Sequence, residues 1–493
     1  MSGFAKKTAL AGSWTVGGKI IARLIDFVTL LVLARLLVPA DFGLVAIATS
    51  ILVVMETILE LPLAPALMRN RTVSRSMLDT AFTLSILRGA TIGIVLLAAA
   101  LPVALIYGDS RLAPLMAVLS IAPVMRSIVS PRLVVYMQGF DFRREFALDV
   151  VIKTTSLVCG IAAAVTLHSY WALAVAAVSG PVAAAIVSYF LAPMRPSLTL
   201  REWRQFRDIV GWNAFAQVLN AINWQVDRLL MPGFASLAIL GAFAIADSLA
   251  GIVHRVFVGP LIAPLVAGFS RLDGPQQLSS AYLKATRAVT LIAAPVLVML
   301  TVLAEPALHL AVGRSWTETV PLFQGLCIVS LLTLPSAIMP AIAMVLDRTR
   351  LVALRMAIEF TVRMPVAVVL IASFGAEGAI AARLIGVAVA YLVTMILMRR
   401  LVAVPVMRQL AAFAHALVPL IPMLGFLVVV EPDLSRMPVG PQLVLMMAAT
   451  GVAAMAIFWL TALCLWKAAG RPPGLEALMV EKLRLHRHRP AAI

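Results

Sequence analysis

The sequence predicts an all-α membrane protein that crosses the bilayer about fourteen times. Long apolar runs recur along the 493-residue chain, and each approaches the roughly 20 residues that a helix needs to cross the hydrocarbon layer. Only 13% of the residues are charged, about half the usual share of a soluble domain. Lys and Arg gather in every second gap between the runs. Helices are expected because backbone groups in lipid must be hydrogen-bonded internally.

The apolar runs give the expected spans in chain order. We place them at 12–35, 42–66, 78–106, 112–136, 146–167, 170–193, 208–231, 237–266, 288–312, 319–344, 356–374, 377–398, 410–430 and 441–466. Only very short turns separate the spans near residues 166–170 and 375–377, so the count depends on these two turns. Residues 193–207 contain two prolines and then a basic amphipathic stretch, which predicts an interfacial linker between two halves.

The cations predict the orientation. Of the 40 Lys and Arg, 26 lie at the N-terminus, in alternate gaps or in the tail, and four lie in the opposite gaps. The positive-inside rule therefore predicts that both termini are cytoplasmic. Ten cations fall within the spans: Lys19, Arg23, Arg88, Arg126, Arg132, Lys153, Arg228, Arg255, Arg363 and Arg383.

A weak internal repeat predicts two duplicated lobes. A shift of 198 residues aligns residues 43–50 (GLVAIATS) with 241–248 (GAFAIADS), and Trp14 with Trp212. We expect an N-lobe of six spans at 1–200, a C-lobe of six at 201–402, spans 13 and 14 at 403–468, and a basic cytoplasmic tail at 469–493. With six spans each, the lobes share one orientation and are related by pseudo-symmetry about an axis along the membrane normal.

Polar residues recur at helical spacing on the first span of each expected lobe. The first stripe contains Thr15, Lys19, Arg23, Asp26 and Thr29, and the second contains Asn213, Gln217, Asn220, Trp224 and Asp227. A polar stripe facing lipid is costly. We therefore expect both stripes to face a central cavity, with Glu56 and Asp247 as further polar lining residues. The alternative, which stays open, is that these side chains only hold helices together.

Some of the ten cations have a simple explanation. Asp149 with Lys153, and Glu359 with Arg363, are spaced for salt bridges within one helix. Lys19, Arg23, Arg126 and Arg255 lie deeper in the spans. A cavity lined by these cations would bind an anion, and a diphosphate suits a group of Arg and Lys. We predict these four as the substrate-binding residues.

Other functional classes are disfavoured. The chain has a net charge of +17, but no soluble domain is expected that could carry a basic patch. We therefore expect contact with anionic lipid and not with nucleic acid. Residues 12–19 (GSWTVGGK) only approximate a phosphate-binding loop, no HExxH motif occurs, and the outer gaps are short. We therefore expect no catalytic residues, no metal site, no cofactor and no enzymatic activity. Coupling to a monovalent cation or to the membrane potential stays open.

Several motifs resemble a known family. Residues 34–44 (ARLLVPADFGL) are similar to the exit of the first span in polysaccharide flippases of the multidrug/oligosaccharidyl-lipid/polysaccharide (MOP) superfamily. Looser likenesses occur at residues 227–230 (DRLL), 313–316 (GRSW) and 374–378 (FGAEG). The resemblance covers roughly residues 5–400. It implies two six-helix lobes, two extra C-terminal spans, alternating access and cavity cations that hold a diphosphate. Lys19 and Arg23 match that role by position.

The resemblance also implies a function. The substrates of that family are undecaprenyl-diphosphate-linked oligosaccharides. They are moved from the cytoplasmic to the periplasmic leaflet of the bacterial inner membrane for exopolysaccharide or O-antigen synthesis. The expected partners are this lipid-linked oligosaccharide, membrane lipids, and a polysaccharide polymerase and glycosyltransferases. Two alternatives remain: a drug or organic-cation antiporter of the same superfamily, and a non-transporting scaffold of a polysaccharide-assembly complex. Cations outnumber acids within the spans, ten to seven, which argues against the antiporter.

Overall fold

The computed structural model describes residues 2–69, 73–207, 212–470, 475 and 477. Within those ranges, the regular structure is entirely helical, as predicted. Ten of the described segments are long and apolar enough to cross a membrane, so the chain is a multi-pass membrane protein, while the count of fourteen stays a prediction. The chain divides into two compact units, Met1–Ala244 and Ile245–Ile493. These units are called unit 1 and unit 2 below, and each is described by itself.

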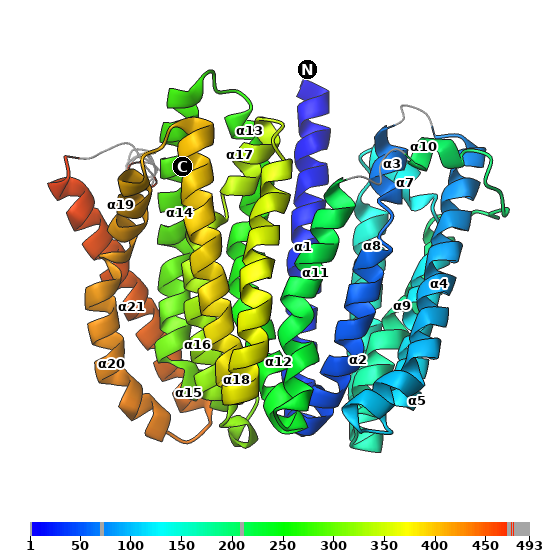
Figure 1. Ribbon diagram of the computed structural model, residues 1–493, viewed down its shortest axis with the longest axis horizontal. Helices are drawn as coiled ribbons and strands as arrows, with labels where there is room; N and C mark the ends of the chain where they lie inside the picture. The colour runs from blue at the N-terminus through cyan, green and yellow to red at the C-terminus, as the bar shows by residue number, and fades with distance from the viewer. Residues whose placement is uncertain (1, 70–72, 208–211, 471–474, 476, 478–493) are drawn as a thin grey trace, which may run out of the picture. The chain divides into compact units, whose positions relative to one another are not determined.

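Unit 1 consists of long helices joined by short ones. Its helices are α1 (Ser2–Leu36), α2 (Pro39–Ile58), α3 (Leu63–Arg69), α4 (Arg75–Tyr107), α5 (Leu112–Leu119), α6 (Ile121–Ser127), α7 (Leu133–Gln138), α8 (Arg143–Leu167), α9 (Trp171–Leu191), α10 (Trp203–Arg207) and α11 (Trp212–Leu230). Helix α8 packs against both α1 and α9, while α2 packs against α11 and α4 against α5 and α6 (Figure 1).

Two predicted spans of unit 1 are not continuous helices. The expected span 42–66 ends as α2 at Ile58 and resumes as α3, and the expected span 112–136 is divided into α5, α6 and α7. Pro62 precedes α3, and Pro131 lies between α6 and α7. Proline lacks an N–H and disfavours helical geometry in the residue before it, which accounts for breaks at these positions.

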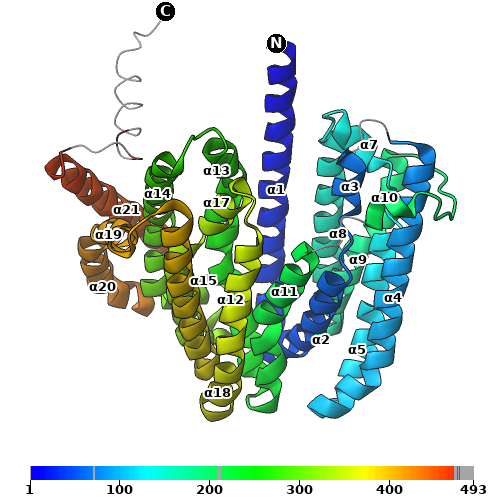
Figure 2. The same cartoon turned by 45° about the horizontal axis from the view of Figure 1, so that its top comes forward.

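One end of unit 1 has a small hydrophobic core of its own. This core contains Ala66 and Leu67 of α3, Met77, Leu78 and Ala81 of α4, Val134 of α7 and Phe206 of α10. Short helices α3, α7 and α10 thus cover the beginning of α4 (Figure 2). We call these three helices, with the non-helical segment 193–202, the cap.

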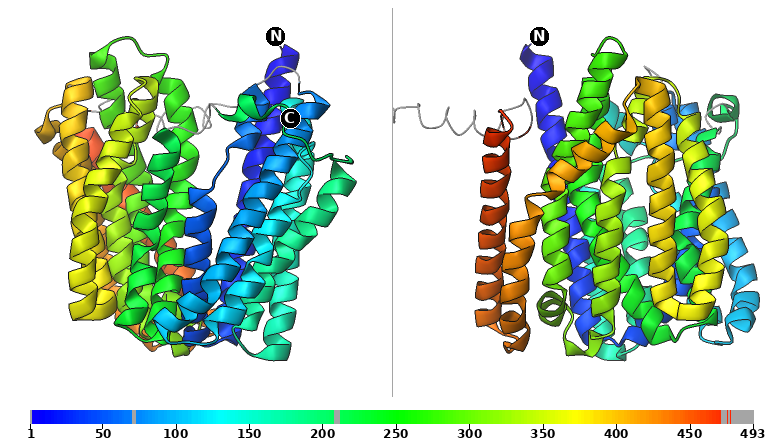
Figure 3. Two further views of the ribbon diagram at one scale, coloured as in Figure 1. Left: turned by 45° about the vertical axis from the view of Figure 1, so that its right-hand side comes forward. Right: turned by 60° about the vertical axis from the view of Figure 1, so that its left-hand side comes forward.

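Unit 2 has α14 at its centre. Its helices are α12 (Leu237–Val253, which begins in unit 1), α13 (Ile262–Phe269), α14 (Pro275–Val302), α15 (Ala304–Ala311), α16 (Thr319–Thr333), α17 (Met339–Val345), α18 (Arg350–Val402), α19 (Val406–Leu417), α20 (Leu420–Arg436) and α21 (Pro441–Ala468). Helix α14 packs against α16, α19 and α20 (Figure 3). The C-terminal helices therefore attach to unit 2 through α14.

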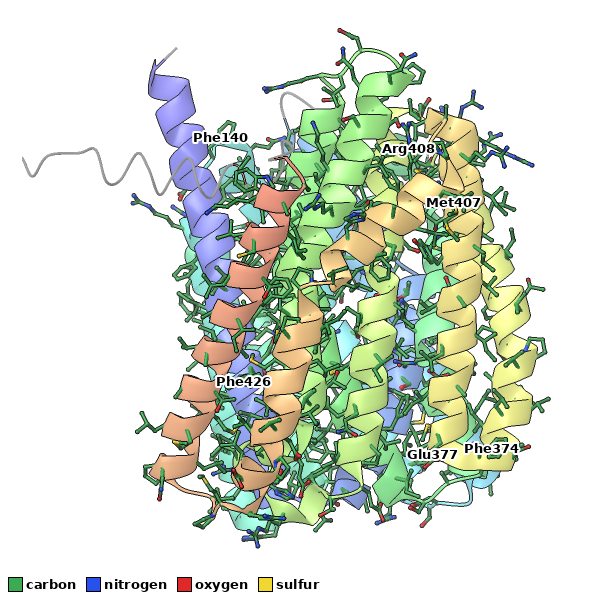
Figure 4. All side chains as sticks on the ribbon, turned by 90° about the vertical axis from the view of Figure 1, so that its left-hand side faces the viewer. Phe140, Phe374, Glu377, Met407, Arg408 and Phe426 are labelled. Atoms are coloured by element: carbon green, nitrogen blue, oxygen red, sulfur yellow. The ribbon has the colours of Figure 1, made fainter. Side chains whose placement is uncertain are left out.

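The 53-residue α18 is two helices joined by a sharp turn. Gly375 has φ 57° and ψ −128°, a conformation that a residue with a side chain rarely adopts. A Cβ at Gly378 would lie 2.0 Å from the carbonyl oxygen of Leu370. Phe374 and Glu377 mark this turn at the end of the unit (Figure 4). The turn falls where the sequence places a break, at residues 375–377.

The two glycines that begin the repeated motif touch each other's helices. A Cβ added to Gly43 of α2 would lie 1.9 Å from the carbonyl oxygen of Leu237, and one added to Gly241 of α12 would lie 1.8 Å from that of Pro39. All four residues belong to unit 1. The first turns of α2 and α12 can approach this closely only because neither crossing residue has a side chain.

Candidate functional site

Helices α1 and α8 share a polar seam. Lys153 Nζ lies 2.8 Å from Asp26 Oδ1, and both side chains are partly exposed. The sequence paired Lys153 with Asp149 on its own helix, and these two groups do interact electrostatically. The ion pair with Asp26 is an additional contact, which the close packing of α1 and α8 allows. Lys19 interacts electrostatically with Glu145 and Asp149 of α8. The seam therefore holds more carboxylates than lysines.

The predicted cations Lys19 and Arg23 are both exposed on α1. Nearby Ala22 is buried and Gly18 contacts Phe146 of α8, so α8 packs against the small residues of α1. Among the described residues, none forms an ion pair with Arg23. Arg23 therefore presents its charge on a long helix without a counter-ion from the described part of the chain.

A second cluster gathers where α2 ends. The Arg126 guanidinium of α6 forms an ion pair with the Glu56 carboxylate of α2. Arg88 Nη2 of α4 donates to the Glu56 backbone oxygen at 2.9 Å. Two arginines thus converge on one glutamate. The cluster carries a net positive charge, and about half of the Arg126 side chain is exposed, with a relative accessibility of 48%.

Unit 2 places its charges differently. Arg383 of α18 forms an ion pair with Asp247 of α12, and both side chains are largely buried. Arg363 lies against Gly386, where a Cβ would approach its Cδ to 2.8 Å, so the two halves of α18 pack around this arginine. Glu359 Oε2 lies 3.8 Å from Arg355 Nη1, a contact not predicted from the sequence, and the pairing of Glu359 with Arg363 stays a prediction.

Arg255 lies in a π-helical turn, His254–Val258, that follows α12. Such turns interrupt α-helices and are frequent at functional sites. The side chain is exposed and folds back along its own helix, where Nη2 donates to the Ser248 carbonyl oxygen at 2.6 Å. Gly251 leaves room for this, since a Cβ there would lie 2.6 Å from Arg255 Nη1.

The second polar stripe is described only in part. Asp227 of α11 is completely buried, while Trp224 is 55% exposed. Helix α11 carries Asn213, Gln217 and Asn220, but their side chains lie outside the described residues. The burial of Asp227 follows from the packing of α11 against α2.

The predicted binding residues are divided between the two units. Lys19, Arg23 and Arg126 belong to unit 1, and Arg255 belongs to unit 2. The diphosphate site formed by all four stays a prediction. Residues that sequence reasoning did not connect are Arg88 with Glu56 and Lys19 with Glu145, because their spacing along the chain gives no signal. Among the described residues, no cluster of His, Cys, Asp and Glu could hold a metal.

Comparison with known proteins places the chain among biosynthetic proteins. A family model described as "Polysaccharide biosynthesis protein" matches residues 32–321. The chain is 24% identical over 343 residues to the lipopolysaccharide biosynthesis protein WzxC of Escherichia coli strain K12, covering 66% of this chain and 68% of WzxC. It is 21% identical over 324 residues to the succinoglycan biosynthesis transport protein ExoT of Rhizobium meliloti strain 1021, covering 64% of this chain and 65% of ExoT, slightly under two thirds of that relative.

Solved structures share the fold. The lipid II flippase MurJ in an inward closed conformation matches with a TM-score of 0.68 and 13% identity, covering 94% of this chain and 100% of that one. An inward-facing multidrug resistance MATE family transporter of the MOP superfamily matches with a TM-score of 0.62 and 15% identity, covering 79% and 95%. The predicted fold class, an all-α polytopic membrane protein, is confirmed.

Proposed function

Because the chain belongs to the polysaccharide biosynthesis protein family, we propose that it moves undecaprenyl-diphosphate-linked oligosaccharides from the cytoplasmic to the periplasmic leaflet by alternating access. The polymer made from them would be an exopolysaccharide or O-antigen. Family membership confirms the resemblance to polysaccharide flippases that residues 34–44 indicate. Its relatives and its fold make the chain a transporter and not an enzyme.

Arg23 is the observation that best supports an anionic substrate. The sequence places Arg23 in the expected first span, and a charged side chain at the centre of such a span costs about 2.5–3.5 kcal/mol to insert. The cost is offset where the charge meets water or an opposite charge. Arg23 is exposed and has no ion-pair partner among the described residues. A diphosphate entering from the cytoplasmic leaflet would supply the missing negative charge.

Arg126 would bind the diphosphate together with Arg23, but it would first have to give up its present ion-pair partner. Its present partner is the Glu56 carboxylate, and about half of its side chain is exposed. A diphosphate carries more charge than a carboxylate and accepts bidentate hydrogen bonds from arginine. The substrate would therefore displace Glu56 from Arg126 when it binds. In unit 2, Arg255 would leave the Ser248 carbonyl oxygen in a similar exchange.

The proposal includes the predicted topology and coupling. Both termini would be cytoplasmic in a bacterial inner membrane, as the distribution of 26 against four cations outside the spans favours. Neither lobe would need a bound nucleotide, and a monovalent cation or the membrane potential would drive the cycle. The polysaccharide polymerase and glycosyltransferases would be its partners in assembly.

Export of polymer tests the binding residues. Replacing both Lys19 and Arg23 by alanine should abolish export without lowering the amount of protein in the membrane, because both side chains are exposed. The matched control is Arg314→Ala, which removes an exposed arginine from a short 3-10 helix of unit 2. Normal export by the double variant at normal abundance would contradict the assignment, as would equal loss in the control.

One observation favours the antiporter alternative. The α1–α8 seam contains Asp26, Glu145 and Asp149 against Lys19 and Lys153, an excess of one carboxylate. An organic cation would bind there better than a diphosphate. An antiporter should protect an expressing strain against cationic drugs and lose that protection in Asp149→Asn. Polymer export that depends on Arg23, with unchanged drug sensitivity, would exclude this alternative.

A further inference from the structure

The non-helical segment 193–202 of the cap is hydrogen-bonded to the first turns of α4. The Asp79 carboxylate accepts from Ser197 N at 3.0 Å and from Ser197 Oγ at 2.8 Å. Thr199 N donates to Thr83 Oγ1 at 2.9 Å, and Asp79 and Thr83 are both buried. A segment that supplies the hydrogen bonds of buried groups has a defined orientation. We call residues 193–202 the strap.

Arginine side chains hold the upstream half of the strap. Arg132 Nη1 donates to the Pro193 carbonyl oxygen at 2.6 Å. Arg75 Nη2 donates to the Arg195 carbonyl oxygen at 3.3 Å. Because these guanidinium groups bond to backbone oxygens, which carry no net charge, their positive charge adds to that of the strap.

The outer side of the strap, meaning its exposed side chains, includes large apolar residues. Leu198, which lies between the two residues bonded to α4, is 71% exposed, and Leu200 is 46% exposed. Trp203, at the start of α10, is 46% exposed as well. Three large apolar side chains thus project from one short stretch.

Cations surround these apolar side chains. Arg195, Arg201 and Arg204 of the same stretch are exposed, as are Arg75 and Arg132 beside it. Exposed leucines with tryptophan and a ring of arginines match a membrane interface, where apolar groups enter the acyl boundary and arginines meet phosphate groups. The strap lies along the start of α4, one of the spanning helices, and so at the level where headgroups are found.

We propose that the outer side of the strap is a docking surface for anionic phospholipid headgroups. Leu198, Leu200 and Trp203 would enter the boundary of the leaflet, while Arg195, Arg201 and Arg204 bind its phosphates. Anionic lipid attracts each such arginine near the surface. The cap would then be anchored to the leaflet as a rigid body, because the strap is bonded to α4. This surface is separate from the cations assigned to the transported substrate.

Quenching of Trp203 by brominated lipid tests the proposal. The full-length protein is placed in nanodiscs of phosphatidylcholine and phosphatidylglycerol, with bromine on the acyl chains of one lipid or the other at equal mole fraction. The chain has eight tryptophans, so the signal of Trp203 is the difference between wild type and Trp203→Phe. We expect Trp203 to be quenched, and more strongly by brominated phosphatidylglycerol than by brominated phosphatidylcholine.

Charge variants separate lipid selectivity from mere proximity. In Arg195→Gln/Arg201→Gln/Arg204→Gln, the ratio of the two quenching constants should fall to about one. The matched control Arg314→Gln/Arg436→Gln removes exposed arginines from a short 3-10 helix and from the end of α20, and should leave the ratio unchanged. Equal quenching by both lipids in the wild type would overturn the proposal. So would quenching of Trp203 by aqueous iodide alone, which would indicate a surface free for a soluble protein. Polymer export is not part of the readout, so failure of the transport assignment leaves this test intact.

Discussion

Ion pairs in the two units differ in how exposed their side chains are. In unit 1, Arg126 and Glu56 are 48% and 22% exposed, and Lys153 and Asp26 are 34% and 50% exposed. In unit 2, Arg383 and Asp247 are only 6% and 15% exposed. The same residue types therefore occur in two environments. This difference separates charges that can exchange their partner for a ligand from charges that hold helices together.

The physical reason is the cost of leaving a charge alone. An exposed ion pair contributes at most about 1 kcal/mol, because water solvates each partner when the pair opens. A buried pair that loses one partner leaves an uncompensated charge and costs about 3–5 kcal/mol. Under the proposed function, unit 1 is therefore the half whose ion pairs a substrate anion would open, and its long helix α1 carries Arg23 in addition.

The largest expected effect is at the buried pair. Arg383→Ala should lower the free energy of unfolding by about 3–5 kcal/mol, because Asp247 would keep a buried negative charge without its arginine. Thermal unfolding of the purified protein in detergent, followed by loss of the monodisperse peak, measures the change. Arg126→Ala is the matched control in unit 1 and should lose far less stability. If the two variants unfold at the same temperature, the contrast between the units is wrong.

Gly43→Ala tests whether unit 1 keeps its stability after any substitution or only after substitutions at its ion pairs. The new methyl group would lie 1.9 Å from the Leu237 carbonyl oxygen, so the helices must separate, at a typical cost of about 1–3 kcal/mol for overpacking. Thermal stability and protein abundance should both fall. Gly17→Ala on α1 meets nothing within 4 Å and should be neutral or slightly stabilising. A stable Gly43→Ala protein would show that the crossing can open without penalty.

The smallest expected effect is at the α1–α8 seam. A double-mutant cycle with Asp26→Asn and Lys153→Gln should give a coupling energy of at most about 1 kcal/mol, because both side chains are partly exposed. The four proteins of the cycle are compared by thermal unfolding. A coupling as large as that of Asp247 with Arg383 would mean that exposure does not separate the two units.

Much of the fold could be predicted from hydropathy. The apolar runs predicted the positions of α4, α8, α9 and α21 to within a few residues, because a helix in lipid must bury its own backbone groups. The breaks around Pro62 and Pro131 were missed, although proline is the signal that could have found them. An apolar run predicts that a segment lies in lipid, but it does not predict whether the helix there is continuous.

Less of the candidate site than of the fold could be predicted from the sequence. Helical spacing placed Lys19 and Arg23 on one polar stripe of α1. Both side chains are exposed, while their position in a central cavity stays a prediction. Partners were harder to predict. Lys153 binds Asp26 and Arg126 binds Glu56, pairs that lie far apart in the chain. Spacing rules find partners one helical turn away, whereas packing between helices decides which distant carboxylate lies nearer.

The crossing of Gly43 and Gly241 has a consequence for genetics. At each glycine, the atoms that an added methyl group would strike first belong to the backbone of the facing helix. No second mutation that shrinks a neighbouring side chain can make room, because every residue has that backbone. A screen for suppressors of a defect at either codon should therefore return true revertants and few compensating changes nearby. Each codon is therefore constrained by itself, whichever residue stands at the other position.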